Sequence, residues 1–176
     1  MIVAITGVGG VGKTAVARIL KRRLGWKLVR SDDIAKKKKL YLGYDKERKS
    51  WIVDLQKLKK ELKKIEKKEK NLIIESLYAH LFDADIVAVL RCEPNVLEKR
   101  LRRKYSWHTK IVENKEAEMI GAISQEAVEK HGRARVFEFD TTKVKPNWTA
   151  KQIIQVIKGE KKKYKIGRID WLEKKA

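Results

Sequence analysis

Residues 7–14 read Gly-Val-Gly-Gly-Val-Gly-Lys-Thr, and this stretch decides the fold. It matches the phosphate-binding pattern G-x-x-x-x-G-K-[ST] in full. Glycine tolerates positive φ and has no Cβ, so the backbone can wrap a phosphate with several N–H groups pointing inward. We expect Lys13 to reach the β- and γ-phosphates and the Thr14 hydroxyl to hold Mg²⁺. The predicted nucleotide contacts in this loop are Gly7, Gly9, Gly10, Val11, Gly12, Lys13, Thr14 and Ala15.

The segments on both sides of the loop predict a strand and a helix. The apolar run 1–6 is typical of a buried parallel strand, and residues 14–24 carry apolar side chains at helical spacing before Gly25. Further apolar runs at 26–29, 71–75, 84–91 and 135–140 predict four more strands. The alternation with helices predicts an α/β fold of the P-loop NTPase class. We expect a five-stranded parallel sheet with helices on both faces, in a single domain over residues 1–176.

Periodicity predicts helices elsewhere in the chain. An amphipathic helix is expected in the lysine-rich stretch 36–70, because apolar side chains recur there at intervals of three and four: Leu55, Leu58, Leu62 and Ile65. One helix is expected over 113–130, with Ile120 among its inward residues, and a last helix over 149–158. The basic C-terminal extension, 160–176, carries apolar side chains that are expected to pack back on the domain, namely Ile169, Trp171 and Leu172.

The chain is strongly basic, with 44 Lys and Arg against 23 Asp and Glu and a formal net charge of +21. Such an excess favours contact with a polyanion such as RNA, a ribosomal particle or an acidic protein surface. A charge-rich thermophile surface is the alternative, although such surfaces usually balance their signs. Residues 36–70 hold fifteen basic and six acidic side chains. Their lysines are either a solvated helix face or an RNA contact.

Cysteine and histidine usage predicts a reducing compartment and no zinc site. Cys92 is the single cysteine, and His80, His108 and His131 show no ligand spacing that would join it. No apolar run approaches the roughly 20 residues that a membrane span requires, and the chain begins with the first strand rather than a basic leader. We therefore expect a cytoplasmic protein with no membrane partner.

The sequence argues against a switch GTPase. Such proteins read guanine with an N-K-x-D motif, whereas residues 114–117 read Asn-Lys-Glu-Ala and lack the aspartate. An ATP-dependent kinase or a motor-type ATPase is left as the expected class of P-loop protein.

Several motifs in linked order resemble the adenylate kinase isoenzyme 6 family in its archaeal form. They are GVGGVGKT, SDDIAK, YDKE with WIVD, VLRC, RLRRKYSWHTKIVENKEAE and ISQEA, within residues 1–145. The resemblance implies a nucleoside monophosphate kinase-like fold with a short lid, and both kinase and ATPase activity with ATP and Mg²⁺. It also implies a role in small ribosomal subunit and rRNA maturation through a platform ribosomal protein, which the basic composition suits.

The resemblance also assigns segments and residues. It places the monophosphate-binding arm at residues 31–54, with acidic positions at Asp33, Asp45 and Asp54. It places the lid at residues 104–114, whose closure excludes water from the transfer. The cationic or nucleotide-contacting positions that follow from it are Arg91 at a strand end, Arg103 and Lys104 at the polyphosphate, and Lys145 near adenine in the loop 142–146.

The end of the third strand carries both a candidate catalytic residue and a departure from the family. Glu75 is expected to order magnesium-bound water, with an exposed strand-end glutamate as the plain alternative. The family usually has a histidine two positions after the acidic residue, but Leu77 stands there and cannot relay protons. His80 could replace it only if the local loop is rearranged. The missing histidine brings the ATPase half of the activity into question and leaves nucleotide binding intact.

Three functions remain open on these grounds. The first is transfer of the ATP γ-phosphate to AMP or a related monophosphate, with Lys13, Glu75, Arg91 and Lys104 as catalytic residues. The second is an assembly ATPase, with little kinase activity, that binds a ribosomal protein or rRNA. The third is a P-loop kinase of another small metabolite.

Overall fold

The computed structural model describes residues 1–104 and 106–173 and contains the predicted five-stranded parallel sheet. The strands lie in the order β2-β5-β1-β6-β7, and every neighbouring pair is parallel. Their bounds are β1 Ile2–Thr6, β2 Lys27–Arg30, β5 Leu72–Glu75, β6 Ile86–Arg91 and β7 Val136–Asp140. All five predicted strands are thus confirmed, each within two residues at either end.

The topology explains where the site lies. The chain leaves β1 towards β2, returns through β5, and crosses to β6 and β7 on the other side of β1. Ligands of open α/β sheets bind beyond the carboxyl ends of the strands where the order reverses in this way. Thr6 at the end of β1 leads directly into the glycine loop, and Glu75 pairs in register with Ile5 of the same strand. The phosphate loop and Glu75 therefore meet at this edge.

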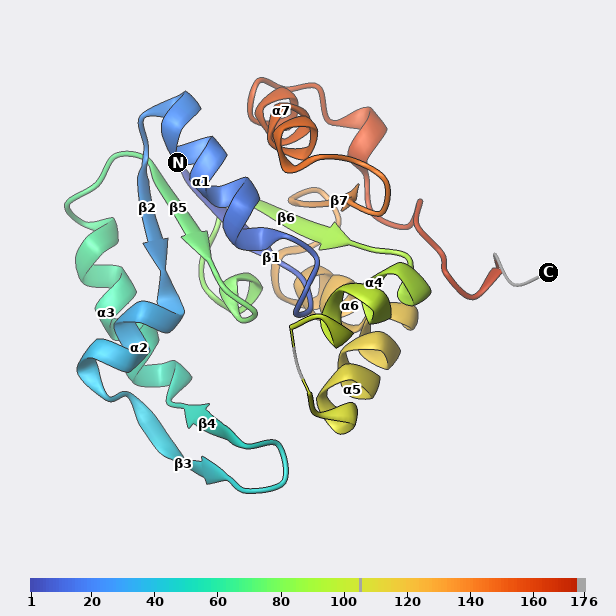
Figure 1. Ribbon diagram of the computed structural model, residues 1–176. Helices are drawn as coiled ribbons and strands as arrows, with labels where there is room; N and C mark the ends of the chain where they lie inside the picture. The colour runs from blue at the N-terminus through green and yellow to red at the C-terminus, as the bar shows by residue number, and fades with distance from the viewer. Residues whose placement is uncertain (105, 174–176) are drawn as a thin grey trace.

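Helices cover both faces of the sheet (Figure 1). Helices α1 (Lys13–Leu24) and α7 (Pro146–Ile157) pack against each other on one face. Helices α3 (Leu55–Glu66) and α6 (Ala122–His131) lie on the other. The remaining helical elements are α2 (Ser31–Lys38), α4 (Pro94–Arg102), α5 (His108–Met119), η1 (Ala79–Leu81) and η2 (Lys162–Tyr164).

The lysine-rich stretch is only partly helical, which corrects the expectation for residues 36–70. Between α2 and α3 the chain forms an antiparallel hairpin, β3 (Tyr41–Asp45) and β4 (Ser50–Val53). Lys39, whose φ of 52° is left-handed, caps the C-terminus of α2, and Asp54 caps the N-terminus of α3, where its carboxylate accepts from Lys57 N at 3.0 Å. Aromatic and β-branched residues on either side of a charged turn were the missed hairpin signal.

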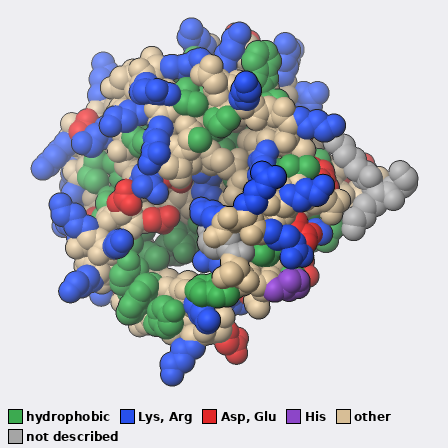
Figure 2. Space-filling model, viewed as in Figure 1, with side chains coloured by type: hydrophobic (Ala, Val, Ile, Leu, Met, Phe, Trp, Pro, Cys, Tyr) green, Lys and Arg blue, Asp and Glu red, His purple; other side chains and the backbone are tan. Residues whose placement is uncertain are grey.

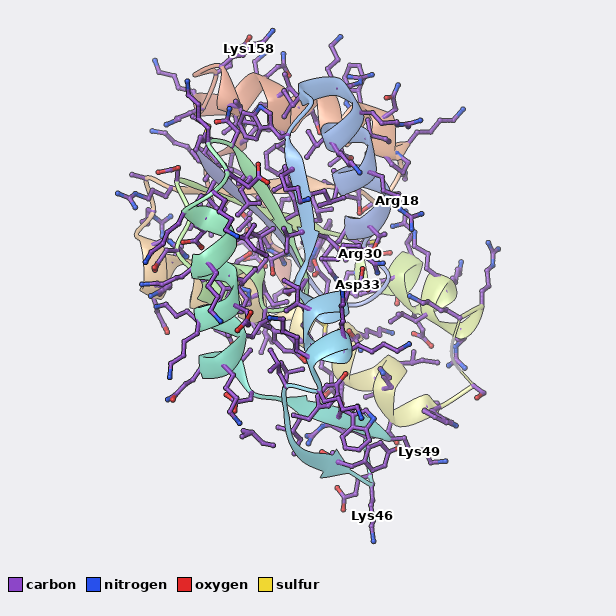
Figure 3. All side chains as sticks on the ribbon, turned by 90° about the vertical axis from the view of Figure 1, so that its left-hand side faces the viewer. Arg18, Arg30, Asp33, Lys46, Lys49 and Lys158 are labelled. Carbon is purple, nitrogen blue, oxygen red and sulfur yellow. The ribbon has the colours of Figure 1, made fainter. Side chains whose placement is uncertain are left out.

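The hairpin extends away from the sheet as an arm. A hollow lies between the arm and helices α4 and α5 on the visible face of the molecule (Figure 2). Lys46 and Lys49 mark the tip of the arm (Figure 3).

The single helix expected over 113–130 is two helices, α5 and α6. The break lies at Gly121, whose φ of 66° does not belong to a right-handed helix. A Cβ there would also lie 3.5 Å from the Arg91 guanidinium. Ile120, expected to face inward, is 55% exposed because the break turns it outward.

The C-terminal extension packs back on the domain, but only one of its three predicted contact residues is buried, and Tyr164, which was not predicted, stacks on Phe139. Trp171 is buried, Ile169 is half-buried and Leu172 is exposed. Residues 174–176 lie outside the described part of the chain. Within the described residues, the structure holds no helix with the length and apolar character that a membrane crossing needs.

Candidate active site

The phosphate loop has the backbone conformation that its glycines predict. Gly7 has φ 133° and Gly12 has φ 98°. A Cβ on Gly7 would approach the Leu90 carbonyl oxygen to 2.5 Å, so only glycine fits against strand β6. Helix α1 starts at Lys13, and its N-terminal N–H groups face the loop, as anion binding requires.

Lys13 lies across this loop. Its Nζ donates to the Gly7 carbonyl at 2.7 Å and to the Val8 carbonyl at 2.8 Å. Burial lowers the pKa of Lys13 to about 8, although the nearby carboxylates of Glu75 and Asp32 act in the opposite direction. The ammonium group is therefore held in place by neutral carbonyls, beside acidic groups that favour its charged form.

Glu75 is buried rather than exposed, so the plain alternative for this residue is wrong. Its side chain accepts from Thr14 Oγ1 at 3.2 Å and from Arg30 Nε at 3.0 Å. The sequence analysis predicted Thr14 and Glu75 as metal-associated residues, and the structure brings them together. It did not single out Arg30, which pairs in register with Glu75 across strands β2 and β5.

A second carboxylate, Asp32, lines the same cleft from the first turn of α2. Its pKa is raised, first by burial and then by the Glu75 carboxylate. Two carboxylates and a hydroxyl give an all-oxygen donor set, which suits Mg²⁺. Among the described residues, no group of three His, Cys, Asp or Glu side chains forms a ready metal cage. A Mg²⁺ ion here would keep most of its waters, as this ion usually does.

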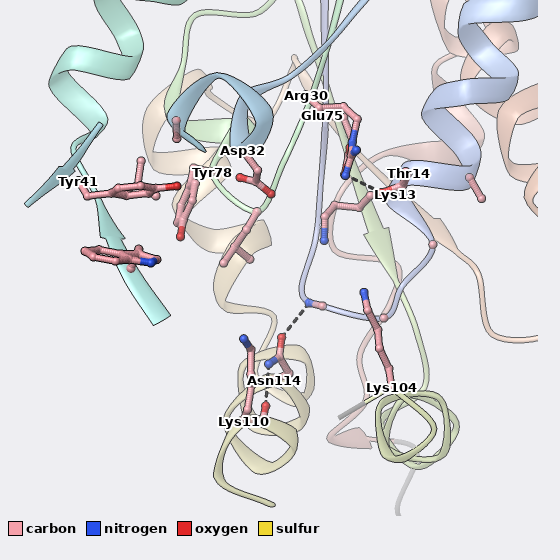
Figure 4. A pocket seen from close by; sticks show the side chains of 18 residues that line it. Lys13, Thr14, Arg30, Asp32, Tyr41, Glu75, Tyr78, Lys104, Lys110 and Asn114 are labelled. Atoms are coloured by element: carbon pink, nitrogen blue, oxygen red, sulfur yellow. Dashed lines mark hydrogen bonds and ion pairs between the residues drawn. The ribbon is translucent and has the colours of Figure 1, made fainter. Parts of the chain in front are cut away.

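The cleft has a volume of about 630 Å³ and connects the phosphate loop with the arm. In Figure 4, Lys13 and Thr14 lie on one side of it and Tyr41 on the other. Tyr41 stacks on Trp51 with ring centroids 5.1 Å apart, and both rings line the cleft together with Tyr78. None of these rings was predicted as a site residue. For Tyr41 and Trp51, the available signal was an aromatic side chain within the predicted arm.

The predicted lid residues divide between the cleft and the surface. Lys104 and Lys110 line the cleft, whereas Arg103 is exposed and does not line it. Asn114 Oδ1 accepts from Gly9 N at 2.7 Å, and its Nδ2 donates to the Lys110 carbonyl at 2.7 Å. Helix α5 is therefore tied to the phosphate loop. Residue 105 of the predicted lid lies outside the described residues.

The three acidic arm positions do not line the cleft. Asp33 is exposed and pairs with Arg30 at 3.3 Å. Asp45 accepts from Arg48 in the hairpin turn, which lowers its pKa, and Asp54 caps helix α3. The cleft carboxylate from this segment is Asp32, one position before the predicted Asp33.

Arg91 does not reach the cleft, which corrects its expected phosphate contact. It is 3% exposed, and its Nε donates to Glu118 Oε1 at 2.7 Å. The other nitrogens contact Ser124, Glu138 and the Glu118 carbonyl. Burial raises the pKa of Glu118, and the arginine opposes this shift. Every guanidinium nitrogen is thus engaged inside the protein.

A smaller cavity of about 260 Å³ adjoins the phosphate loop where the base-side loop was predicted. Val144 and Pro146 line it together with Gly10, Val11 and Gly12, but the predicted contact Lys145 does not. Thr149 Oγ1 is buried beside this cavity and has no hydrogen-bond partner within the described residues.

His80 does not take the place of the missing histidine. It is 2% exposed and does not line the cleft, while Leu77 does. Its Nδ1 is 2.9 Å from Thr6 Oγ1 and its Nε2 is 2.9 Å from Glu126 Oε2. Burial lowers the pKa of His80, and the Glu126 carboxylate partly opposes this. The imidazole supports the strand end beneath the phosphate loop.

Sequence relatives identify the family of this chain. Proteins named "Putative adenylate kinase" from Methanocaldococcus jannaschii and Pyrococcus abyssi are each 37% identical, over 99% and 98% of this chain and 94% and 92% of their own. This chain belongs to their family. The resemblance inferred from the motifs is thereby confirmed. A family model described as an AAA domain also matches residues 3–121 of this chain.

Solved structures of low sequence identity share the fold of this family member. Shikimate kinase from Acinetobacter baumannii superposes with a TM-score of 0.64 at 18% identity, covering 92% of this chain and 94% of its own. Deoxyadenosine kinase from M. mycoides superposes with a TM-score of 0.60 at 13% identity, covering 90% of this chain and 99% of its own. The P-loop kinase fold accommodates different acceptors, so the acceptor has to be argued from the arm.

Proposed function

We propose that this protein is an ATP-dependent nucleoside monophosphate kinase that transfers the γ-phosphoryl group of ATP to AMP or a related monophosphate. One observation carries the proposal: the phosphate loop, two aromatic residues of the arm and Tyr78, which follows β5, line the same cleft. Tyr41, Trp51 and Tyr78 offer flat apolar surfaces, which suit a nucleobase better than a small acid without an aromatic ring.

In this mechanism the protein aligns two phosphates and offsets charge on the transferred group. The loop amides and Lys13 hold the donor phosphates, and Lys104 and Lys110 line the same cleft. Mg²⁺, when bound, would neutralise phosphate charge, and Thr14 with Glu75 are the residues that would hold it. Arg30 orients the Glu75 carboxylate through its 3.0 Å contact.

A coupled assay of ADP formation with ATP and a panel of monophosphates tests the proposal. Lys13→Ala removes the phosphate contact and should abolish the activity. Trp51→Ala should raise KM for the monophosphate several-fold and leave KM for ATP unchanged, because Trp51 stacks on Tyr41, across the cleft from Lys13 and Thr14. No ADP above the Lys13→Ala background would refute the kinase function. Activity on a metabolite without a ring, indifferent to Trp51→Ala, would favour the metabolite kinase.

The charge of +21 favours a second role, as an ATPase that assists ribosomal assembly through a ribosomal protein or rRNA. Pull-down from a ribosome-containing lysate, with and without ATP, tests this role. ATP hydrolysis without acceptor distinguishes an ATPase from a kinase. A protein that captures no ribosomal component in either condition would have only the first function.

A further inference from the structure

The face formed by α1, α7 and the loop before α7 is basic and lacks acidic side chains. Residues 13–31 and 141–159 contain no Asp or Glu. Exposed cations project from both segments, and we call them together the α1–α7 face: Arg18, Lys21, Arg22, Arg23, Lys143, Lys145, Lys151 and Lys158. Figure 2 shows basic side chains gathered over this region, and Figure 3 labels Arg18 and Lys158 on it.

The two segments form one continuous surface. Helices α1 and α7 pack side by side, and Arg23 Nη2 donates to Asn147 Oδ1 at 2.7 Å. Trp148 is 53% exposed between the cations, with Lys151 Nζ lying 5.3 Å from its ring centroid. The surface thus combines a row of positive charges with an accessible indole ring.

The cations of the α1–α7 face differ from several lysines around α3 that lie next to acidic side chains. None of them forms an ion pair among the described residues. Around α3, by contrast, Lys57 pairs with Asp54 at 3.2 Å, and Lys59 and Lys63 each lie 3.8 Å from Asp83. Acidic side chains therefore neutralise part of the lysine-rich stretch, whereas the α1–α7 face keeps its positive charges unneutralised.

We infer that the α1–α7 face binds a single-stranded nucleic acid. The cations match a phosphate backbone, whose contacts supply most sequence-independent affinity. Trp148 supplies the stacking surface on which an unpaired base can lie, and an acidic protein would make no comparable use of it. This inference rests on the proposed assembly role, since it specifies the site where that partner would bind.

Fluorescence anisotropy with short oligouridylate and oligothymidylate tests the inference. The variant Arg18→Gln/Lys21→Gln/Arg22→Gln/Lys151→Gln removes four charges of the α1–α7 face. We expect it to weaken binding at least tenfold. We also expect it to reduce the slope of log affinity against log salt by about 2 to 3, because each single-strand phosphate contact contributes about 0.7.

The matched control, Lys60→Gln/Lys67→Gln/Lys68→Gln/Lys70→Gln, removes the same charge near α3, where acidic residues intervene. It should weaken binding only about twofold, through net charge. Trp148→Ala should weaken binding about tenfold without changing the salt slope, since stacking releases no counterions. Tighter binding of oligouridylate identifies the ligand as RNA, and tighter binding of oligothymidylate identifies it as DNA.

Three results would overturn the inference. They are equal losses in the two quadruple variants, displacement of the oligonucleotide by polyglutamate at equal charge concentration, and preference for duplex with no effect of Trp148→Ala. ADP formation and melting temperature are measured on the same samples. Intact kinase activity with lost oligonucleotide binding separates this surface from the nucleotide cleft. If the quadruple variant does not fold, the single change Lys151→Glu applies the same test.

Discussion

Arg48 in the turn of the arm hairpin donates from Nε to Glu113 Oε1 of helix α5 at 3.0 Å. The two residues lie 65 positions apart and belong to the segments predicted as arm and lid. Next to them, Lys49 Nζ lies 4.5 Å from the ring centroid of Trp107. Asp45 Oδ2 accepts from Arg48 Nη1 at 3.0 Å, so Asp45, which was predicted as an acidic arm residue, has a structural role. The arm and α5 therefore contact each other across the mouth of the cleft.

Breaking this contact should weaken catalysis modestly. Arg48 and Glu113 are 59% and 40% exposed, and ion pairs of that kind contribute about 0 to 1 kcal/mol. We expect Glu113→Gln and Arg48→Gln each to lower kcat/KM for the monophosphate by no more than about fivefold. The double variant should have a kcat/KM no lower than that of the less active single variant. A double-mutant cycle would measure this non-additivity as a coupling energy between Arg48 and Glu113. Glu47→Gln, in the same turn, is the control, and coupling within error of zero would count against the contact.

ATP binding should depend on pH through Lys13. Burial lowers the pKa of Lys13 to about 8, so the free protein loses this positive charge as the pH rises above that value. Polyphosphate favours the charged form, and binding at about pH 8.5 should therefore take up a proton. Calorimetry in two buffers of different ionisation enthalpy measures this uptake, which should vanish near pH 6.5. In Lys13→Ala, affinity should be weak at both pH values with no proton uptake from this group.

The parts of the fold that the sequence predicts well are those determined locally. The strands are short apolar runs because parallel strands are buried on both faces, and the glycines fix the phosphate loop by their backbone conformation. Thr14 and Glu75 could be paired in advance, since both lie at the carboxyl edge of the sheet. The hairpin was missed because the spacing of Leu55 and Leu58 suggested that the helix extended through the whole lysine-rich stretch.

Contacts between distant segments explain most of the remaining errors. Arg91 stands at a strand end. The local sequence there is the same whether the arginine contacts a phosphate or pairs with a buried carboxylate, so it does not distinguish the two roles. Its partners Glu118 and Glu138 lie 27 and 47 positions away, and only the tertiary structure brings them to it. Likewise, Asp32 rather than Asp33 lines the cleft because the two side chains leave the first turn of α2 in different directions. The sequence of two adjacent aspartates does not show which one faces the cleft.

His80 should make stability depend on pH in a way that its substitution reveals. Its folded-state pKa lies below the ordinary value of 6.5, so the folded protein favours the neutral ring. As the pH decreases below about 6.5, the imidazole takes up a proton more readily in the unfolded chain than in the folded protein. The folded protein therefore becomes less stable as the pH decreases. We expect the difference in melting temperature between wild type and His80→Gln to narrow from about pH 7 to about pH 5. The matched substitution His108→Gln, at an exposed site, provides the comparison, and a constant difference for His80→Gln would contradict this interpretation.

Arg91 should act on stability rather than on nucleotide binding. Arg91→Met would leave the carboxylates of Glu118 and Glu138 buried without their cation, and breaking a buried pair in this way costs about 3 to 5 kcal/mol. Glu118 also accepts from Trp171 Nε1 at 2.9 Å, so the C-terminal extension should loosen as well. Urea unfolding measures the loss, and Trp171 fluorescence reports the extension.

A surface arginine provides the comparison for Arg91. Arg102 pairs with Glu98 at 2.6 Å but is 55% exposed, so Arg102→Met should cost no more than about 1 kcal/mol. Adding Glu118→Gln and Glu138→Gln to Arg91→Met should recover part of the stability, because the uncompensated charges disappear. Under conditions where Arg91→Met remains folded, its ATP affinity should equal that of wild type. If the folded variant instead loses tenfold or more in ATP affinity, Arg91 contacts the ATP phosphates, since removing a direct charged contact has an effect of that size.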